Sequence, residues 1–171
     1  MVTAHRRENH GDGIHSLCQA ILDLAEEYTN LDFIFPVHLN PNVRQMVNAQ
    51  IQGHPQILLI EPVDFSTMLY LEAKATLIIT DSGGVQEEAT SFCTPVIIMR
   101  DRTERAEGVE QGFATLAGTS IEGIVRATKH YLNHSNIKND LVSKSNPYGD
   151  GLAAKRILNV LNNRKIEEFA Q

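Results

Sequence analysis

Residues 80–89, TDSGGVQEEA, combine the residue types that bind an anion. They follow the apolar run 76–80 and begin a helical pattern, so the two glycines stand where a strand passes into a helix. Gly83 and Gly84 have no Cβ to keep an anion from the backbone, Ser82 adds a hydroxyl donor, and a helix start carries partial positive charge. The segment predicts a diphosphate-binding loop, with a plain Ser-Gly-Gly turn as the structural alternative.

Two glutamates follow this loop on the expected helix. Glu88 lies one turn into the helix, and we expect its carboxylate to point back toward the ligand and accept hydrogen bonds from sugar hydroxyls. Glu87 lies about 100° further round the helix and is expected to be solvated. The loop has neither the P-loop spacing nor the GxGxxG pattern, so neither an ATPase nor a dinucleotide enzyme is indicated.

A second charged segment, RDRTERAEG at residues 100–108, follows the apolar run 95–99. We expect Arg105 to supply the cation that a diphosphate leaving group needs, because a guanidinium binds phosphate oxygens well. Its side chain is expected to be held by Glu104 or Glu107. For the other arginines of the segment, Arg100 and Arg102, solvent exposure is the favoured interpretation.

Histidines are the third candidate group. His5, in the segment HRREN, suits a general acid or a hydrogen-bond donor to phosphate near neutral pH, and Arg6 and Arg7 add positive potential. His5, His10 and His15 are five residues apart, which does not place metal ligands on one helix face, so no metal site is expected.

His38 directly follows a second expected strand and should therefore face the same edge of the sheet as Ser82, although a buried structural histidine is an equal alternative. The segment NPYGDG, residues 146–151, is interpreted as structural: Pro147 and Gly149 shape a turn, and Asp150 caps the last helix.

The elements that position these residues alternate between strand and helix. Strands are expected at 2–5, 32–37, 57–60, 76–80, 95–99 and 113–116, and helices at 13–29, 42–50, 64–73, 84–92, 121–132 (capped by Ser120) and 151–161, with an irregular connection over 133–150. Continuously apolar strands separated by helices are buried on both faces, which predicts a parallel sheet. The fold class is therefore α/β, a three-layer doubly wound parallel sheet, with ligands bound at the carboxyl ends of its strands.

Composition fits one globular domain over residues 1–171, with 42% hydrophobic and 21% charged residues. A net charge of −6 without a basic stripe argues against a nucleic-acid partner. No apolar stretch reaches the roughly 18 residues of a membrane span, and the start lacks a signal-peptide pattern, so we expect a cytoplasmic protein without membrane contact.

Cys18 and Cys93 lack CxxC spacing and are expected to be buried thiols. The motif HRREN within ten residues of the first Met indicates a longer parent protein.

Taken in order, VTAHRREN, PVHLNPNV, TDSGGVQEEA, TER with its following Glu, and NPYGDG resemble the non-hydrolysing UDP-N-acetylglucosamine 2-epimerases over essentially the whole chain. The resemblance corresponds to the second half of the family's length. It implies the Rossmann-like C-terminal domain of a two-domain, GT-B-type enzyme. Such an enzyme interconverts UDP-GlcNAc and UDP-ManNAc by eliminating UDP and adding it back, without NAD or another cofactor, and is a homodimer at full length.

The resemblance also implies roles for individual residues. His5 and Arg105 would stabilise the departing diphosphate as catalytic residues. The remaining substrate contacts that the resemblance implies are Ser82, Gly83 and Gly84 to UDP, Glu88 to the ribose, Met68 near uracil, and His38 near an activator molecule of UDP-GlcNAc. The family's lysine and the acids that handle the C2 proton belong to the absent N-terminal domain, so the chain alone is expected to be inactive.

Three positions depart from the family's pattern. Ala106 stands where the family usually has Pro, Cys93 where it has Gly, and Met68 where an aromatic residue helps to hold uracil. Two other functions remain open: the nucleotide-sugar half of a GT-B glycosyltransferase, which HRREN and TER argue against, and a non-catalytic UDP-sugar-binding module.

Overall fold

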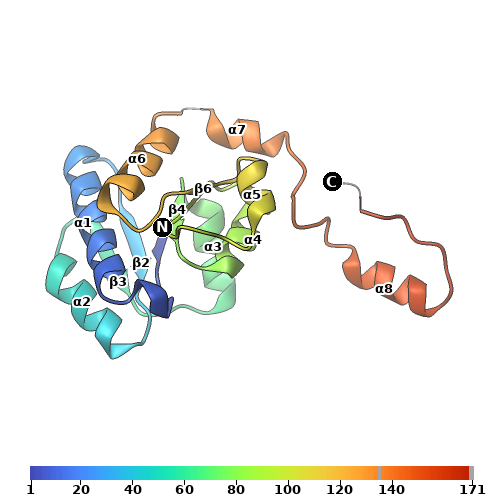
Figure 1. The fold of residues 1–171 in the computed structure, drawn as a ribbon, viewed down its shortest axis with the longest axis horizontal. Coiled ribbons are helices and arrows are strands. Elements are labelled where there is room, and N and C mark those ends of the chain that lie inside the picture. The colour runs from blue at the N-terminus through green and yellow to red at the C-terminus, as the bar shows by residue number, and fades with distance from the viewer. Residues whose placement is uncertain (135, 170–171) are drawn as a thin grey trace.

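Six short parallel strands lie at the centre of the part of the chain that the computed structural model describes, residues 1–134 and 136–169 (Figure 1). The strands are β1 (Val2–Thr3), β2 (Phe33–Pro36), β3 (Ile57–Ile60), β4 (Ile78–Thr80), β5 (Val96–Ile98) and β6 (Ala114–Leu116). The helices between and after them are α1 (Asp12–Glu27), α2 (Pro41–Ile51), α3 (Phe65–Lys74), α4 (Gly83–Thr90), α5 (Ala106–Glu110), α6 (Ile121–Leu132), α7 (Ile137–Val142) and α8 (Ala153–Leu161), with a short 3-10 helix at Arg7–Asn9.

The strand order reverses between β1 and β4. Strands β1, β4, β5 and β6 form one hydrogen-bonded parallel sheet, β2 pairs with β3, and β1 and β2 contact each other. From β1 the chain therefore builds outward through β2 to β3, and then returns to build the other side through β4, β5 and β6. This is the doubly wound arrangement, in which ligands bind where the order reverses. The predicted fold class is confirmed.

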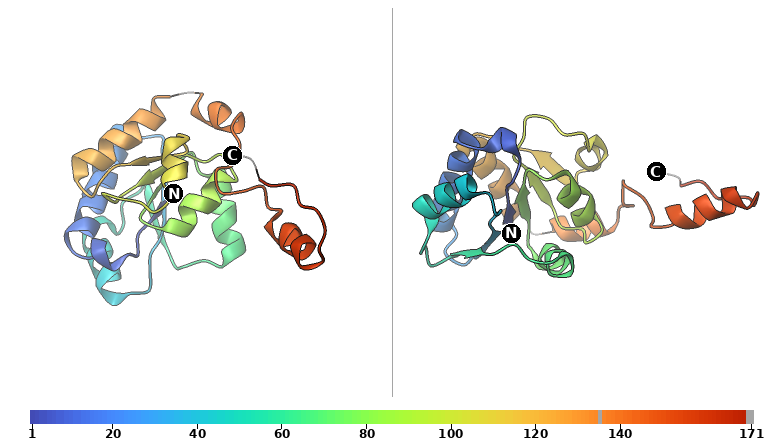
Figure 2. Two further views of the ribbon diagram at one scale, coloured as in Figure 1. Left: turned by 45° about the vertical axis from the view of Figure 1, so that its right-hand side comes forward. Right: turned by 90° about the horizontal axis from the view of Figure 1, so that it is seen from below.

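Helices cover both faces of the sheet, as Figures 1 and 2 show. Alternate side chains of β4 explain why the strands are apolar throughout: Ile79 packs in the core that includes α1, α2 and α6, whereas Ile78 packs in the core that includes α4. Helix starts follow the sequence signals, since Asn40 accepts the backbone N–H of Asn42 before α2, and Ser120 accepts that of Gly123 before α6.

Two short α-helices, as well as the 3-10 helix at Arg7–Asn9, were not expected from the sequence. Helix α5 lies in the charged segment after β5, and α7 lies within the stretch expected to be irregular. Neither is long enough to repeat an apolar face, which is the signal that marks the longer helices. The prediction that Asp150 is the cap residue of the last helix is also wrong: α8 begins after Leu152, whose backbone N–H the Asp150 carboxylate accepts.

The two cysteines differ in burial. Cys18 is buried as predicted, and its burial raises the pKa of the thiol to about 12. Cys93 is only partly buried, so that prediction is wrong. It stands in the turn after α4 with φ of +52°, a left-handed conformation that favours glycine.

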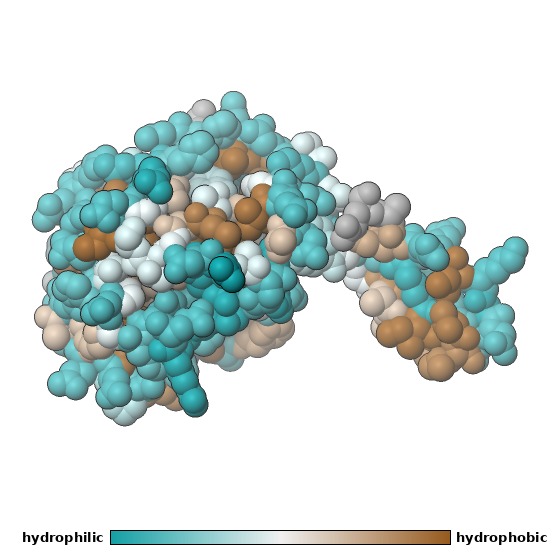
Figure 3. Space-filling model, in the orientation of Figure 1, coloured by the Kyte–Doolittle hydropathy of each residue, from teal (hydrophilic) through white to brown (hydrophobic). Residues whose placement is uncertain are grey.

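Helix α8 lies apart from the main body at the end of an extended connection (Figures 1 and 2). It has no buried residue, and apolar side chains are visible on its surface in Figure 3. In the described part of the chain, no helix combines the length and apolarity that a membrane crossing requires.

Candidate functional site

The first site element is a carboxylate at the end of β4. Residues Val2 and Thr3 of β1 pair with Ile79 and Thr80 of β4, so the segments that follow these two strands emerge side by side. Asp81, which is fully buried, accepts the backbone N–H of His5 and Arg6 and the side-chain amide of Asn9 at 2.9–3.2 Å. Asp81 therefore fastens the HRREN segment to the glycine-containing loop. The sequence analysis did not single it out, although an Asp directly after a fully apolar strand is an available signal.

His5 and His38 lie together beside Asp81. The His5 ring places Nδ1 3.4 Å from Asp81 Oδ1, and its side chain is 43% exposed. The ring stacks with that of His38, the two centroids being 6.0 Å apart with an angle of 26° between the planes. His38 is exposed, so the alternative of a buried structural histidine is wrong. His38 therefore lies at the carboxyl edge of the sheet, next to His5 and close to the segment that contains Ser82, as predicted.

The start of α4 presents two glycines with different surroundings. Gly83 is buried, and a Cβ there would lie 3.1 Å from Glu104 Oε1. Gly84 is exposed, and a Cβ there would meet nothing closer than Glu88 Oε1 and Ser82 Oγ, both at 3.9 Å. Ser82 precedes the helix, but its hydroxyl makes no capping hydrogen bond. The start of α4 therefore brings together the predicted ligand contacts Ser82, Gly83, Gly84 and Glu88.

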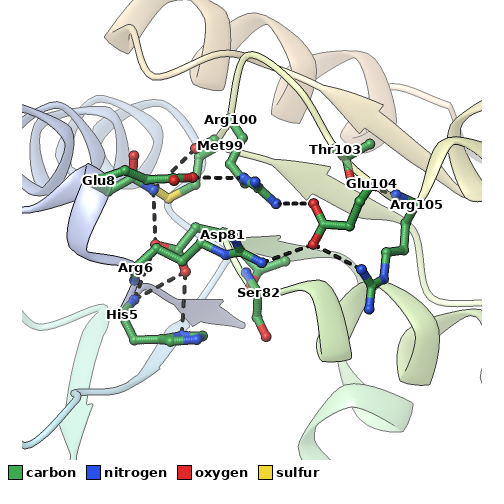
Figure 4. Close-up of polar contacts among 12 residues, drawn as sticks. His5, Arg6, Glu8, Asp81, Ser82, Met99, Arg100, Thr103, Glu104 and Arg105 are labelled. Atoms are coloured by element: carbon green, nitrogen blue, oxygen red, sulfur yellow. Dashed lines mark hydrogen bonds and ion pairs between the residues drawn. The ribbon is translucent and has the colours of Figure 1, made fainter.

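A cluster of arginines meets this helix start around the carboxylate of Glu104 (Figure 4). Oε1 binds Arg6 Nη2 and Arg105 Nη1, each at 3.0 Å, and Oε2 binds Arg100 Nη1 at 2.8 Å. A hydrogen bond from its own backbone N–H, followed by the contact with Arg100, lowers the pKa of Glu104 to about 2. The carboxylate is thus charged throughout the physiological range, and the three guanidinium groups around it are each paired with a carboxylate of the chain.

The acidic partners of these arginines differ in part from the expectation. Arg105 is held by Glu104, as predicted, and also by Glu87, whose Oε1 lies 2.6 Å from Arg105 Nε. Glu87 is therefore an ion-pair partner rather than merely solvated. Arg100 is not solvent-exposed as expected: its side chain is 13% exposed because Glu8 and Glu104 bind it from two sides. Arg102 is exposed, as predicted.

The segment before α8 also supports the site. The Tyr148 hydroxyl donates to the backbone carbonyl of Arg105 at 3.2 Å and accepts the backbone N–H of Gly108 at 3.1 Å. The Asn146 carboxamide accepts the Thr90 hydroxyl at the end of α4. The turn expected at Pro147 and Gly149 is present, although the cap role expected of Asp150 was wrong. Tyr148, which the sequence analysis missed, connects this turn to the backbone of Arg105.

A buried acid lies behind Glu88. Glu72 on α3 has no exposed surface, and within residues 1–134 and 136–169 neither of its carboxylate oxygens has a hydrogen-bond partner that meets normal geometry. Burial, and then the neighbouring Glu88 carboxylate, raise the pKa of Glu72 to about 8. Glu72 was also missed, although it is four residues after Met68 and so shares its side of the helix. Met68 is partly buried and packs against the core cluster that contains Val85 of α4.

Together, the fold and this edge define a Rossmann-like α/β domain in which a glycine-containing helix start lies beside a cluster of arginines. The family model described as UDP-N-acetylglucosamine 2-epimerase matches residues 1–162. The chain belongs to this family.

Individual relatives agree with this assignment. UDP-N-acetylglucosamine 2-epimerase of Yersinia pestis is 44% identical over 97% of this chain and 44% of its own length. The solved S. aureus MnaA–UDP co-structure has a TM-score of 0.92 and 39% identity, covering 99% of this chain and 48% of that one. The UDP-GlcNAc 2-epimerase from Neisseria meningitidis, bound to UDP-GlcNAc, has a TM-score of 0.88 and 39% identity over 95% of this chain and 44% of that one. The chain thus spans less than half the length of the relatives it matches.

Proposed function

We propose that the chain is the UDP-binding half of an epimerase that interconverts UDP-GlcNAc and UDP-ManNAc by eliminating and re-adding UDP. The observation that carries the proposal is the start of α4, where the exposed Gly84 lies between Ser82 and Glu88 and the adjacent Gly83 lies against the arginine cluster. A diphosphate placed there would meet backbone N–H groups at a helix start and nearby guanidinium groups. The relatives named above that were solved with UDP and UDP-GlcNAc support a uridine nucleotide as the ligand.

The chemistry that these residues would perform is stabilisation of a leaving group. When the bond between sugar C1 and the diphosphate oxygen breaks, negative charge grows on the departing UDP. Fixed donors and cations aimed at that charge lower the barrier most, because they need no rearrangement during the reaction. We assign this role to Arg105 and the backbone of Gly83 and Gly84, with His5 donating a proton or hydrogen bond to the diphosphate.

The remaining predicted residues would position the substrate. Glu88 would accept hydrogen bonds from the ribose hydroxyls, and Met68 would lie near the uracil. His38, beside His5, would contact the substrate or an activator molecule of UDP-GlcNAc. The groups that remove and return the C2 proton are assigned to the other half of the protein, so the chain alone should give no turnover. For the whole protein we propose a cytoplasmic homodimer.

Gly84→Ala tests the ligand site with little effect on the free protein. The nearest atoms would be 3.9 Å from the new methyl group, an ordinary contact, and alanine favours the helix. Calorimetric titration with UDP should show binding by the wild-type chain and an affinity about tenfold lower or worse for the variant, since the methyl group blocks approach to the backbone. Thermal unfolding should be unchanged or slightly higher. Equal UDP affinity in the two proteins would contradict the site.

Turnover is tested separately. Incubation of UDP-GlcNAc with the chain alone should leave the anomeric proton NMR spectrum unchanged. The whole protein should produce UDP-ManNAc, and hydrolysis or transfer to an acceptor in its place would contradict the proposed reaction.

A further inference from the structure

A carboxylate occupies the position at the start of α4 where an anion would be expected. Glu104 Oε1 lies 3.1 Å from the point where a Cβ on Gly83 would stand, and Gly83 is the first residue of the helix. Helix starts attract negative charge, whether it comes from a ligand or from the protein. The protein therefore places its own anion at this helix start (Figure 4).

The groups that bind this carboxylate come from separate segments. Arg6 follows β1, Arg100 follows β5 and Arg105 precedes α5, yet all of them contact Glu104 at 2.8–3.0 Å. Convergent guanidinium groups on two oxygens also form the arrangement that binds phosphate oxygens. Glu104 thus makes the guanidinium contacts that a phosphate group would make at the same place.

Glu104 is also able to leave. Its side chain is 42% exposed, so it can turn into solvent without opening the core. Arg100 would keep its contact with Glu8 at 2.9 Å, and Arg105 would keep its contact with Glu87 at 2.6 Å. Two of the arginines are therefore held in place independently of Glu104, and the cluster would remain assembled for another anion.

We propose that Glu104 is an internal substitute for phosphate and that a nucleoside diphosphate binds by exchange with it. The inference rests on the proposed function and adds a residue that determines which anions bind. An anion must outcompete a carboxylate held by several guanidinium groups, so small monovalent anions are excluded while a diphosphate, with more charge and more oxygens, enters. The apparent affinity for the ligand is then the intrinsic affinity multiplied by the fraction of molecules in which Glu104 has left the arginines.

The test compares Glu104→Gln with the wild type, using calorimetry with UDP, inorganic pyrophosphate and uridine. Glutamine keeps the size of the side chain but removes the competing charge. We expect the variant to bind UDP and pyrophosphate about three- to tenfold more tightly, and uridine, which has no phosphate, with unchanged affinity. Glu8→Gln is the matched control, because it removes the same charge from the other side of Arg100 and leaves Glu104 in place.

The outcomes separate the two proposals. Weaker or equal binding of UDP and pyrophosphate by Glu104→Gln would overturn the exchange, and would mean that Glu104 only holds the arginines. An equal gain in anion affinity in Glu8→Gln would also overturn it, since the loss of any one negative charge near the arginines would then explain the effect. If pyrophosphate binds more tightly to Glu104→Gln but UDP binds no better than pyrophosphate, the exchange stands and the proposed uridine site fails.

Discussion

The buried carboxylate of Asp81 accepts the backbone N–H of His5, 76 residues earlier in the chain. Strand β1 ends at Thr3, so beyond it the chain has no strand neighbour to satisfy its backbone donors. Asp81 supplies that partner at the carboxyl end of β4. The position of His5 in the site therefore depends on an acid from the next strand of the sheet.

Replacement of Asp81 should destabilise the fold and loosen the site together. Asp81→Ala would leave the backbone N–H groups of His5 and Arg6 and the amide of Asn9 without their acceptor. We expect a loss of about 2–4 kcal/mol in the free energy of unfolding, since each buried donor left unsatisfied costs about 1–3 kcal/mol. Urea denaturation measures this. Asp101→Ala, at an exposed position, is the control and should cost less than about 0.5 kcal/mol.

Arg105→Ala should weaken UDP binding. We expect a loss of more than about 1 kcal/mol in binding free energy, the usual scale for a charge-assisted contact. Arg102→Ala removes the same charge at an exposed position of the same segment and should leave the affinity nearly unchanged. Calorimetry on both variants gives the comparison, and equal losses would show that only the general positive potential matters.

How far the sequence predicts this site depends on how local the signal is. Ser82, Gly83 and Gly84 were placed correctly at a helix start because strand, turn and helix are adjacent in the chain. His5 and His38 were placed at the same edge because parallel strands end together. Such predictions need only periodicity and the topology of the sheet.

The partners of the charged groups could not be predicted in the same way. Glu104 contacts Arg6 across 98 positions, and Tyr148 contacts Arg105 across 43. The pairing of Arg105 with the adjacent Glu104 was predicted, but which distant acid meets which arginine depends on the final packing of loops, which no local pattern encodes. The same applies to Glu72, whose burial against α4 is set by how two helices pack.

Glu72 should make stability depend on pH. Its pKa is raised to about 8 in the folded chain, mainly by burial, and has its ordinary value of 4.5 when unfolded. Between these values the unfolded chain has released the proton and the folded chain still holds it, so stability falls as pH rises from about 4.5 to about 8. The slope from this group is at most about 1.4 kcal/mol per pH unit, and it vanishes above the folded pKa.

Glu72→Gln removes that titration. The variant should gain stability relative to the wild type as pH rises through this window, as measured by urea denaturation at several pH values. Glu110→Gln, at an exposed position, controls for the loss of one carboxylate. A difference between Glu72→Gln and wild type that stays constant with pH would show that Glu72 ionises normally.

Helix α8 should make the isolated chain associate with itself. Ile157, Leu158 and Leu161 lie on one side of this nine-residue helix and are 59%, 59% and 74% exposed. Exposed apolar side chains gathered in one place favour association, and a helix this short is only marginally stable without packing. We expect the apparent mass in light scattering to rise with protein concentration, and a hydrophobic dye to bind.

A double variant tests whether this face is responsible. Leu158→Lys with Leu161→Lys should keep the chain monomeric and reduce dye binding, because both charges fall within the apolar side of the helix. Asn159→Lys places one added charge on the opposite side and should leave association unchanged. If the wild-type chain remains monomeric at every concentration, the exposed side chains of α8 are too few to drive association, and the helix is then expected to fray in solution, with rapid amide hydrogen exchange over residues 153–161.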